Sequence, residues 1–321
     1  MENTEKKQPL VQVKNLCKYF EISRKETLKA VDDLTFDIYK GETVSLVGES
    51  GCGKSTTGRT MIKLYNPTSG NVYYDGKDIF KYNHAEQKEF CKKVQMIFQN
   101  PYSSLNPRMT VKDIVEEGLK QHGMSTKDAD AKVEQLLATV GLNKDHMSRF
   151  PHEFSGGQRQ RIGIARALSV DPEFIICDEP ISALDVSIQA QVINMLKELQ
   201  EERGLTYLFI AHDLSMVRYV SDDVGVMYLG QLVELSEADE IYKHPLHPYT
   251  KALLDTVPGI YDESGRTLAS IPGIVPENYD QIPGCRFADR CAFAGEGCEK
   301  KQEMREIEKD HFVRCHKADR S

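Results

Sequence analysis

The hydrophobic positions along the chain follow two different periods. Apolar and polar residues alternate over residues 11–38, which is typical of strands with one buried face. Residues 94–98, 174–177 and 205–211 are short, nearly unbroken apolar runs, the pattern of parallel strands buried on both faces. Residues 110–168 carry apolar positions at i, i+3 and i+4, which indicates helices. This order predicts an α/β fold in which a small antiparallel sheet comes first and an all-helical insert interrupts the later strands.

Turn-forming residues separate these elements. Asp75 and Gly76 stand between two short strand patterns and predict a hairpin. Residues 100–110 contain two prolines and are expected to form a loop. Beyond residue 245 the α/β pattern ends, and prolines exclude long helices up to the cysteine-containing end: Pro245, Pro248, Pro258, Pro272, Pro276 and Pro283. We therefore expect one domain over residues 1–245, with its helical part over about 100–168, and a small irregular domain over residues 246–321.

Composition narrows the class of protein. Of the 321 residues, 40% are hydrophobic and 28% are charged, a balance that can form a sizeable core. The net charge of −8 argues against a nucleic-acid-binding protein. No apolar run approaches the roughly 20 residues that span a bilayer, and the first ten residues lack the apolar core of a signal peptide. We expect a cytosolic chain that does not enter a membrane by itself.

One stretch fits the phosphate-binding pattern G-x-x-x-x-G-K-[ST], between an apolar strand pattern and a helix-compatible segment. Its residues are Gly48, Glu49, Ser50, Gly51, Cys52, Gly53, Lys54 and Ser55, followed by Thr56. Glycines let the backbone turn so that its N–H groups point at phosphate oxygens. Lys54 would reach the β- and γ-phosphates of a nucleotide, and Ser55 would bind Mg²⁺. A glycine-rich turn that matches by chance is the alternative for the motif taken alone.

A second anion-binding helix end is expected at residues 155–157. Ser155 is a good N-cap, and Gly156 and Gly157 expose backbone N–H groups at the start of a helix. Without the first phosphate loop, a simple capped surface helix would be the better interpretation. The two features together indicate a protein that binds phosphate at more than one place.

Polar residues end the buried strands, where ligands of parallel sheets bind. Asp178 at such an end suits Mg²⁺, and Glu179 is placed to act as the general base on an attacking water. His212 follows the next strand and can contact a γ-phosphate. Gln99 also follows a strand, and the alternative is that it is an ordinary surface amide. For Asp178 and Glu179, the alternative is a solvated strand end.

These motifs, in this order over about residues 10–240, resemble the ATP-binding cassette (ABC) ATPases, which have a P-loop NTPase (RecA-like) core. In that resemblance residues 48–56 are the Walker A loop, Gln99 the Q-loop glutamine and a Mg²⁺ ligand, and Ser155, Gly156, Gly157 and Gln158 the core of the signature. Residues 174–179 correspond to Walker B, residues 182–185 to the D-loop, and His212 to the switch histidine. Phe20, or as second choice Tyr19, corresponds to the aromatic residue that stacks on adenine. Phe154 stands where the family's signature usually has leucine.

The resemblance implies a head-to-tail dimer in which each ATP lies between the Walker A loop of one chain and the signature of another. This chain has one of each, so a second ABC ATPase subunit must complete the site. The expected partner is a subunit related to this chain. Glu179, His212 and Gln99 are the implied catalytic residues. ATP and Mg²⁺ are the implied substrate and cofactor.

Residues 100–111, residues 244–254 and the sequence IPGIVP resemble the oligopeptide/dipeptide importer subfamily, which also covers nickel importers. The resemblance implies a peripheral subunit on the cytoplasmic face of the membrane. Its partners would be two membrane permeases and an extracellular solute-binding protein, and residues about 100–120 would receive a permease helix. A nickel or other small-solute importer ATPase of the same subfamily, a soluble ABC ATPase and an exporter ATPase are the alternatives.

Four of the eight cysteines fall within 31 residues: Cys285, Cys291, Cys298 and Cys315. Metal binding explains such a cluster better than disulfides in a reducing cytosol. Their spacing, C-x5-C-x6-C-x16-C, lacks the close pair usual in zinc sites, whereas four thiolates from an irregular segment suit an iron–sulfur cluster. The subfamily resemblance implies a [4Fe-4S] cluster. Zn²⁺ is the second candidate and free thiols the third, with His311 and His316 as possible substitute ligands.

Overall fold

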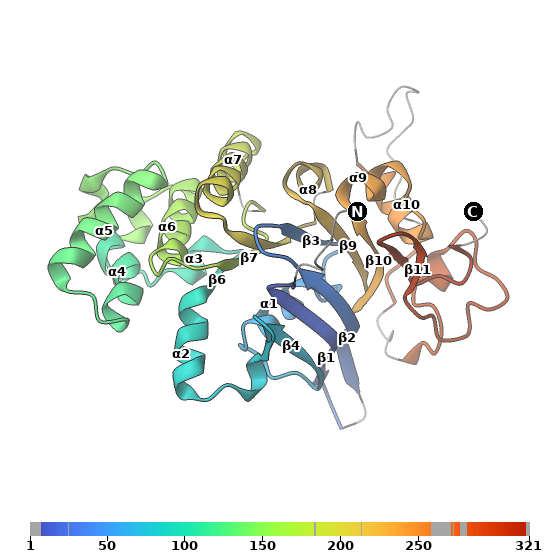
Figure 1. Ribbon diagram of the computed structural model, residues 1–321. Coiled ribbons are helices and arrows are strands. Elements are labelled where there is room, and N and C mark those ends of the chain that lie inside the picture. Colours follow the sequence, from blue (N-terminus) through green and yellow to red (C-terminus); the bar gives the residue numbers. More distant parts are fainter. Residues whose placement is uncertain are drawn as a thin grey trace, which may run out of the picture. The chain divides into compact units, whose positions relative to one another are not determined.

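The structure is a computed structural model that describes residues 8–24, 26–182, 184–212, 214–257, 271, 273–276 and 281–318. Ala183 of the expected D-loop, Asp213, Pro258 and Pro272 lie outside the described residues. The chain forms two compact units, Met1–Lys81 with Phe209–Ser321, and Tyr82–Leu208 (Figure 1). The boundary expected near residue 245 stays a prediction.

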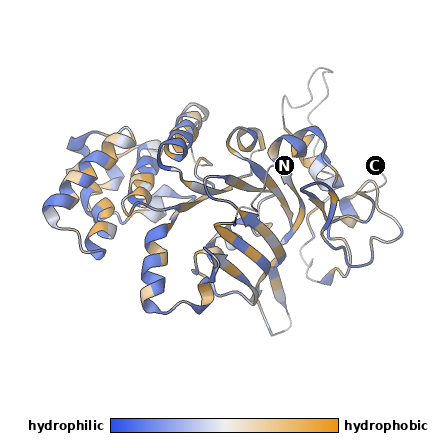
Figure 2. Ribbon diagram, viewed as in Figure 1, coloured by the Kyte–Doolittle hydropathy of each residue, from blue (hydrophilic) through white to orange (hydrophobic). Residues whose placement is uncertain are grey.

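The first unit begins with the expected antiparallel sheet. Its strands, in the order β2-β1-β4-β5, are β1 (Val11–Glu21), β2 (Thr27–Ile38), β4 (Ser69–Tyr74) and β5 (Lys77–Asp78). Hydrophobic and hydrophilic positions alternate along these strands (Figure 2). Asp75 and Gly76 both have positive φ, 48° and 73°, as a two-residue hairpin turn requires. The predicted sheet and hairpin are therefore confirmed.

A second sheet in this unit carries the phosphate loop. Its strands, in the order β11-β12-β10-β9-β3, are β3 (Thr43–Val47), β9 (Asp223–Tyr228), β10 (Gln231–Glu237), β11 (Arg305–Glu308) and β12 (His311–Val313). Strand β3 is buried throughout and pairs in parallel with β9. The expectation of a wholly irregular C-terminal part was wrong at residues 305–313, because β12 pairs with β10 and extends the sheet.

Short helices complete the first unit. They are α1 (Lys54–Met61), α8 (Leu214–Val220), α9 (Ala238–Lys243), α10 (Pro248–Leu254) and the 3₁₀ turns η1 (Ile79–Lys81) and η5 (Ala288–Arg290). Within the described part of residues 245–318, α10 is the longest helix, with seven residues. The expectation that prolines exclude long helices there is thus confirmed for the described residues.

The second unit contains the helical insert. Its elements are α2 (His84–Lys93), β6 (Val94–Ile97), α3 (Pro101–Ser104), α4 (Val111–Gln121), α5 (Thr126–Thr139), η2 (Lys144–Ser148), η3 (Pro151–Glu153), α6 (Gly156–Leu168), β7 (Phe174–Asp178) and α7 (Val186–Arg203). Strand β8 (Thr206–Ile210) begins in this unit, and its last two residues belong to the first. Strands β6 and β7 are parallel, with Val94 opposite Phe174 and Ile97 opposite Cys177. Their carboxyl ends therefore share one edge of the sheet.

The expected loop at residues 100–110 was wrong over α3. The Asn100 side chain accepts hydrogen bonds from the N–H groups of Tyr102 and Ser103, at 2.9 and 3.4 Å. Pro101 occupies the first helical position, where its missing N–H costs nothing. The proline that suggested a loop instead begins a short capped helix.

A buried carboxylate joins three elements of the first unit. Glu234 of β10 is fully buried and accepts hydrogen bonds from the N–H groups of Leu246 and His247, at 2.7 and 3.0 Å. Its Oε1 atom also lies 2.8 Å from Nε2 of His311 in β12. Burial lowers the pKa of His247 to about 4, so this imidazole is neutral near pH 7.

We predict that Glu234→Ala lowers the free energy of unfolding by on the order of 3–5 kcal/mol, because it leaves buried donors without an acceptor. Urea unfolding of the full chain measures this loss. Glu237→Ala is the control, since Glu237 is exposed on the same strand and should cost less than about 0.5 kcal/mol. Equal losses in the two variants would contradict the role given to Glu234.

Candidate nucleotide-binding site

The phosphate loop between β3 and α1 has a backbone that requires glycine. Gly48, Gly51 and Gly53 have φ of 146°, 79° and 104°. A Cβ atom on Gly48 would lie 2.1 Å from the Met227 carbonyl oxygen, and one on Gly53 would lie 2.0 Å from that of Ala30. Strands β9 and β2 thus pack against this loop so closely that a side chain at either glycine would clash with backbone.

Lys54 lies inside this loop. Its side chain is buried, and Nζ donates to the carbonyl oxygens of Gly48 and Glu49 at 2.7 and 3.0 Å. The ammonium also lies 3.6 Å from the sulfur of Cys52, whose pKa is raised by burial, so this thiol stays protonated. A positive charge is therefore fixed by loop carbonyls at the point where a phosphate is expected, and Ser55 follows it in the first turn of α1.

The aromatic candidates for base stacking differ in their surroundings. The Tyr19 hydroxyl donates to Oδ1 of Asp32 at 2.5 Å. Phe20 is half-buried and packs edge-on against Tyr65, with 5.5 Å between ring centroids. The base-stacking role of Phe20, with Tyr19 as second choice, stays a prediction. His212, in the same unit, is exposed at the end of β8.

In the second unit, Gln99 and Glu179, each placed by the sequence at a strand end, form a direct contact. Nε2 of Gln99 donates to Oε2 of Glu179 at 2.7 Å, and Asp178 is fully buried at the end of β7. Glu179 has φ of 46°, a left-handed conformation that is unfavourable for a residue with a side chain. Such strain is typical of functional sites. The amide holds the carboxylate that a general base would use, so freeing Glu179 requires Gln99 to move.

The second predicted anion site is a capped helix end. The Ser155 hydroxyl accepts from the Gln158 N–H at 3.4 Å, and the Gln158 side chain accepts from the Ser155 N–H at 3.1 Å. A Cβ on Gly157 would lie 2.7 Å from a methyl of Ile188 in α7, which explains a small residue there. Helix geometry gives the N–H groups of Gly156 and Gly157 no acceptor within α6, so these two are suited to bind an anion.

Two arginines of α6 hold the α3 segment, which the sequence patterns did not indicate. The Arg159 guanidinium lies 3.7 Å from the centroid of the Tyr102 ring. Arg166 donates to the carbonyl oxygen of Ser104 at 2.5 Å. A displacement of α6 therefore acts directly on α3, residues Pro101–Ser104.

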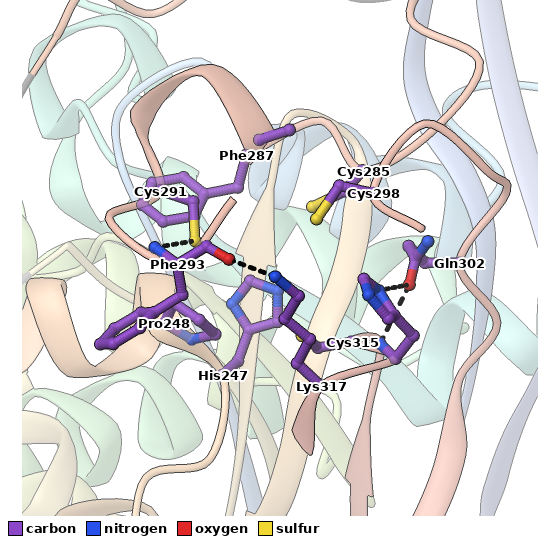
Figure 3. Close-up of a pocket in the computed structure, with 12 residues that line it drawn as sticks. His247, Pro248, Cys285, Phe287, Cys291, Phe293, Cys298, Gln302, Cys315 and Lys317 are labelled. Carbon is purple, nitrogen blue, oxygen red and sulfur yellow. Dashed lines mark hydrogen bonds between the residues drawn. The ribbon is translucent and has the colours of Figure 1, made fainter. Parts of the chain in front are cut away.

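The four clustered cysteines line one cavity of the first unit (Figure 3). All four are partly exposed thiols, and the N–H of Cys285 donates to the carbonyl of Cys298 at 2.8 Å. Burial, with smaller contributions from the other three cysteines, raises the pKa of Cys285 to about 11. Among the described residues, no group of three or more His, Cys, Asp or Glu side chains is arranged to hold a metal ion.

The two histidines considered as substitute ligands lie in different surroundings. His316 lines the cysteine cavity, and its ring lies 3.1 Å from the Gln302 side-chain oxygen. His311 pairs with Glu234 instead.

Arg290, between two of the cysteines, was missed by the sequence analysis: it reaches Glu49 of the phosphate loop, 241 positions earlier in the chain. No local sequence pattern can reveal such a pair.

Sequence comparisons agree with these features. The chain matches a family model described as "ABC transporter" over residues 31–182, and one described as "Oligopeptide/dipeptide transporter, C-terminal region" over residues 233–298. It is 56% identical to the oligopeptide transport ATP-binding protein OppF of Bacillus subtilis (strain 168), over 97% of each chain. It is 49% identical to the dipeptide transport ATP-binding protein DppF of Lactococcus lactis subsp. cremoris, over 95% of this chain and 93% of that protein.

Solved structures give the same fold. A dimeric, post-hydrolysis structure of the ATP-binding cassette MJ0796 bound to ADP and Pi has a TM-score of 0.66 and 30% identity, covering 71% of this chain and 98% of that one. The cbiO1 structure from Clostridium perfringens has a TM-score of 0.65 and 25% identity, over 74% of this chain and 91% of that one. The predicted α/β phosphate-loop fold is therefore confirmed.

We predict that Lys54→Ala abolishes measurable nucleotide binding, because the loop then lacks the one ammonium that its own carbonyls hold in place. Equilibrium dialysis with MgATP measures the effect. Lys63→Ala, which removes an ammonium beyond the end of α1, is the control and should bind as the unaltered chain does. Unchanged affinity in Lys54→Ala would contradict the phosphate-binding role.

Proposed function

The chain belongs to the ABC transporter ATPase family, in its oligopeptide/dipeptide branch, and from this premise we propose that it hydrolyses ATP to power the import of oligopeptides or dipeptides. The observation that carries the proposal is the full set of nucleotide motifs followed by the matched C-terminal region. The oligopeptide and dipeptide relatives are aligned over nearly their whole length. The alternatives of a nickel importer, an exporter and a soluble ATPase lack a comparable observation.

Nucleotide binding and hydrolysis each have residues suited to them. The N–H groups of the phosphate loop and Lys54 bind the β- and γ-phosphates, and Phe20 stacks on the base. Glu179, once released by Gln99, accepts a proton from the attacking water. His212 contacts the γ-phosphate. Ser55 and Asp178, with Gln99, would hold Mg²⁺, which would neutralise phosphate charge; a fully buried carboxylate at a strand end fits such a cation.

The site is completed by another polypeptide. The chain has one phosphate loop and one signature helix end, and the similar cassette MJ0796 is dimeric with ADP and Pi bound. Two anion-binding ends from two subunits can clamp one triphosphate, so ATP binding favours dimer closure. The partner is a second ABC ATPase subunit of the same branch.

The link to transport runs through α3 and α4. Among the described residues, no helix is both long and apolar enough to cross a bilayer. As in the importer branch to which the chain belongs, two membrane permeases would provide the path, with this subunit bound at the cytoplasmic face and an extracellular protein delivering the peptide. Residues about 100–120 receive a permease helix. Arg159 and Arg166 hold this region against the signature helix α6. A movement of α6 on ATP binding would therefore be transmitted to the permease.

The cysteine cavity is proposed to hold a [4Fe-4S] cluster through Cys285, Cys291, Cys298 and Cys315. Each iron of such a cluster takes one cysteine thiolate, and four cysteines from an irregular segment can supply them. Structural zinc sites usually contain a pair of cysteines two to four residues apart, and the spacing C-x5-C-x6-C-x16-C has no such pair. The cluster would cross-link a segment with few apolar residues and so contribute to its stability.

We predict that Glu179→Gln binds ATP but hydrolyses it at least ~10²-fold more slowly, the scale of one lost acid–base catalyst. Peptide uptake by the assembled importer should stop with it. Phosphate release and uptake of a labelled peptide measure the two effects. Asp171→Asn, an exposed carboxylate on the same unit, is the control. Near-normal hydrolysis in Glu179→Gln excludes this residue as the base. Normal hydrolysis without peptide uptake in the unaltered complex contradicts the import function alone.

We predict that the chain purified without air is brown and contains about four irons per chain. Cys298→Ser should lose the visible absorbance and the iron. Cys91→Ser, at an exposed cysteine of the second unit, should keep both. A colourless chain that contains zinc, or no metal, would contradict the cluster.

A further inference from the structure

The carboxylate of Glu49 presents an electrostatic problem for the proposed ATPase function. Glu49 follows the first glycine of the phosphate loop, so the stretch proposed to bind a triphosphate itself carries a negative charge. The negative charges of the carboxylate and of the phosphates repel each other, most strongly where water is scarce. A loop that binds phosphate tightly needs this carboxylate neutralised or turned away.

Arg290 does both. Its Nη1 donates to Oε2 of Glu49 at 2.7 Å and its Nη2 to Oε1 at 3.1 Å, a two-point pair that fixes the direction of the carboxylate. The Arg290 side chain is 4% exposed and that of Glu49 28%. The hydrogen bonds to Glu49 raise the pKa of Arg290 above its ordinary value, so the guanidinium stays charged.

Every polar group of Glu49 is held. Its N–H donates to the hydroxyl of Tyr249 in α10 at 2.9 Å, and its carbonyl oxygen accepts from Lys54 at 3.0 Å. Arg290 in turn donates to the hydroxyl of Tyr228 in β9 at 3.2 Å. The same residue therefore accepts Lys54 on its carbonyl and Arg290 on its carboxylate, so the ion pair restrains the stretch of backbone that also holds the phosphate-binding ammonium.

A neighbouring arginine supports the opposite side of the nucleotide site. Arg286, which follows Cys285, donates to Oδ2 of Asp32, the carboxylate that also accepts from Tyr19. Burial raises the pKa of Asp32, but the Tyr19 hydrogen bond and the Arg286 charge outweigh it, so the pKa lies below its ordinary value. The cysteine-bearing segment thus contacts both the phosphate loop and the strand next to Phe20.

We propose that Arg290 is a positioning residue of the nucleotide site: it neutralises Glu49 and fixes the phosphate loop in its binding conformation. The C-terminal segment is thereby part of the nucleotide site and not a separate attachment. This rests on the proposed ATPase function and adds to it a residue outside the nucleotide-binding motifs.

The test is the affinity of the full chain for MgADP, measured by calorimetry together with the thermal midpoint without nucleotide. Arg290→Gln should weaken binding about tenfold, the scale of one charge-assisted contact. Arg290→Lys keeps the charge but not the two-point geometry, so its affinity for MgADP should lie between those of the unaltered chain and Arg290→Gln. Glu49→Gln removes the repulsive charge together with the pair, so it should bind MgADP more tightly than Arg290→Gln, and its affinity is the reference for the double variant.

The double variant Arg290→Gln with Glu49→Gln distinguishes positioning from bulk stability. If Arg290 acts by neutralising Glu49, the double variant binds MgADP like Glu49→Gln alone, so the second substitution restores what the first one lost. A residue needed only for folding would lower the thermal midpoint without this restoration. Failure of Glu49→Gln to restore binding would overturn the proposal.

Arg314→Gln is the matched control. Arg314 is equally buried in the same segment and also precedes a cysteine, but its hydrogen bonds go to the carbonyl oxygens of Leu232, Gln302 and Asp33, away from the phosphate loop. It should bind MgADP within about twofold of the unaltered chain. Equal weakening by Arg314→Gln, or unaltered binding by Arg290→Gln, would overturn the inference alone. An unaltered chain that does not bind MgADP would overturn the ATPase function as well.

Discussion

The packing of two strands against the phosphate loop is the constraint on which the rest of the structure depends. The carbonyl oxygens of Met227 and Ala30 lie about 2 Å from where side chains at Gly48 and Gly53 would begin. Only glycine allows this approach, and the approach turns the loop inward around Lys54. The same strands, β9 and β2, carry Tyr228 and Asp32, which receive the C-terminal arginines. Loop, sheet and C-terminal segment therefore form one nucleotide-binding body.

The residues expected to bind and hydrolyse the nucleotide are divided between the two compact units. The phosphate loop belongs to the first compact unit, whereas Gln99, Glu179 and the signature helix belong to the second. In the second unit, one helix carries both the anion-binding end at Ser155 and the arginines that hold the α3 segment. In the proposed function, a nucleotide bound by a partner at one end of this helix would act on the segment that receives the permease helix.

The sequence was most informative where the chemistry is local. The phosphate loop, the Asp75–Gly76 hairpin and the buried strand before Asp178 each follow from residues close together in the chain. The α3 helix was missed because a proline near a loop also suits the first turn of a helix. Strands β11 and β12 were missed because each has only three or four residues, too few for a pattern. The Arg290–Glu49 pair joins residues that only tertiary structure brings together.

The most direct test of the shared nucleotide clamp is the ATPase rate per chain as a function of concentration, measured with and without the Ser155→Arg substitution. The account predicts that the rate per chain rises with concentration, or on addition of the partner ATPase when this chain does not pair with itself. It also predicts that Ser155→Arg abolishes the rise. A rate per chain that is independent of both concentration and partner, and that persists in Ser155→Arg, would contradict it.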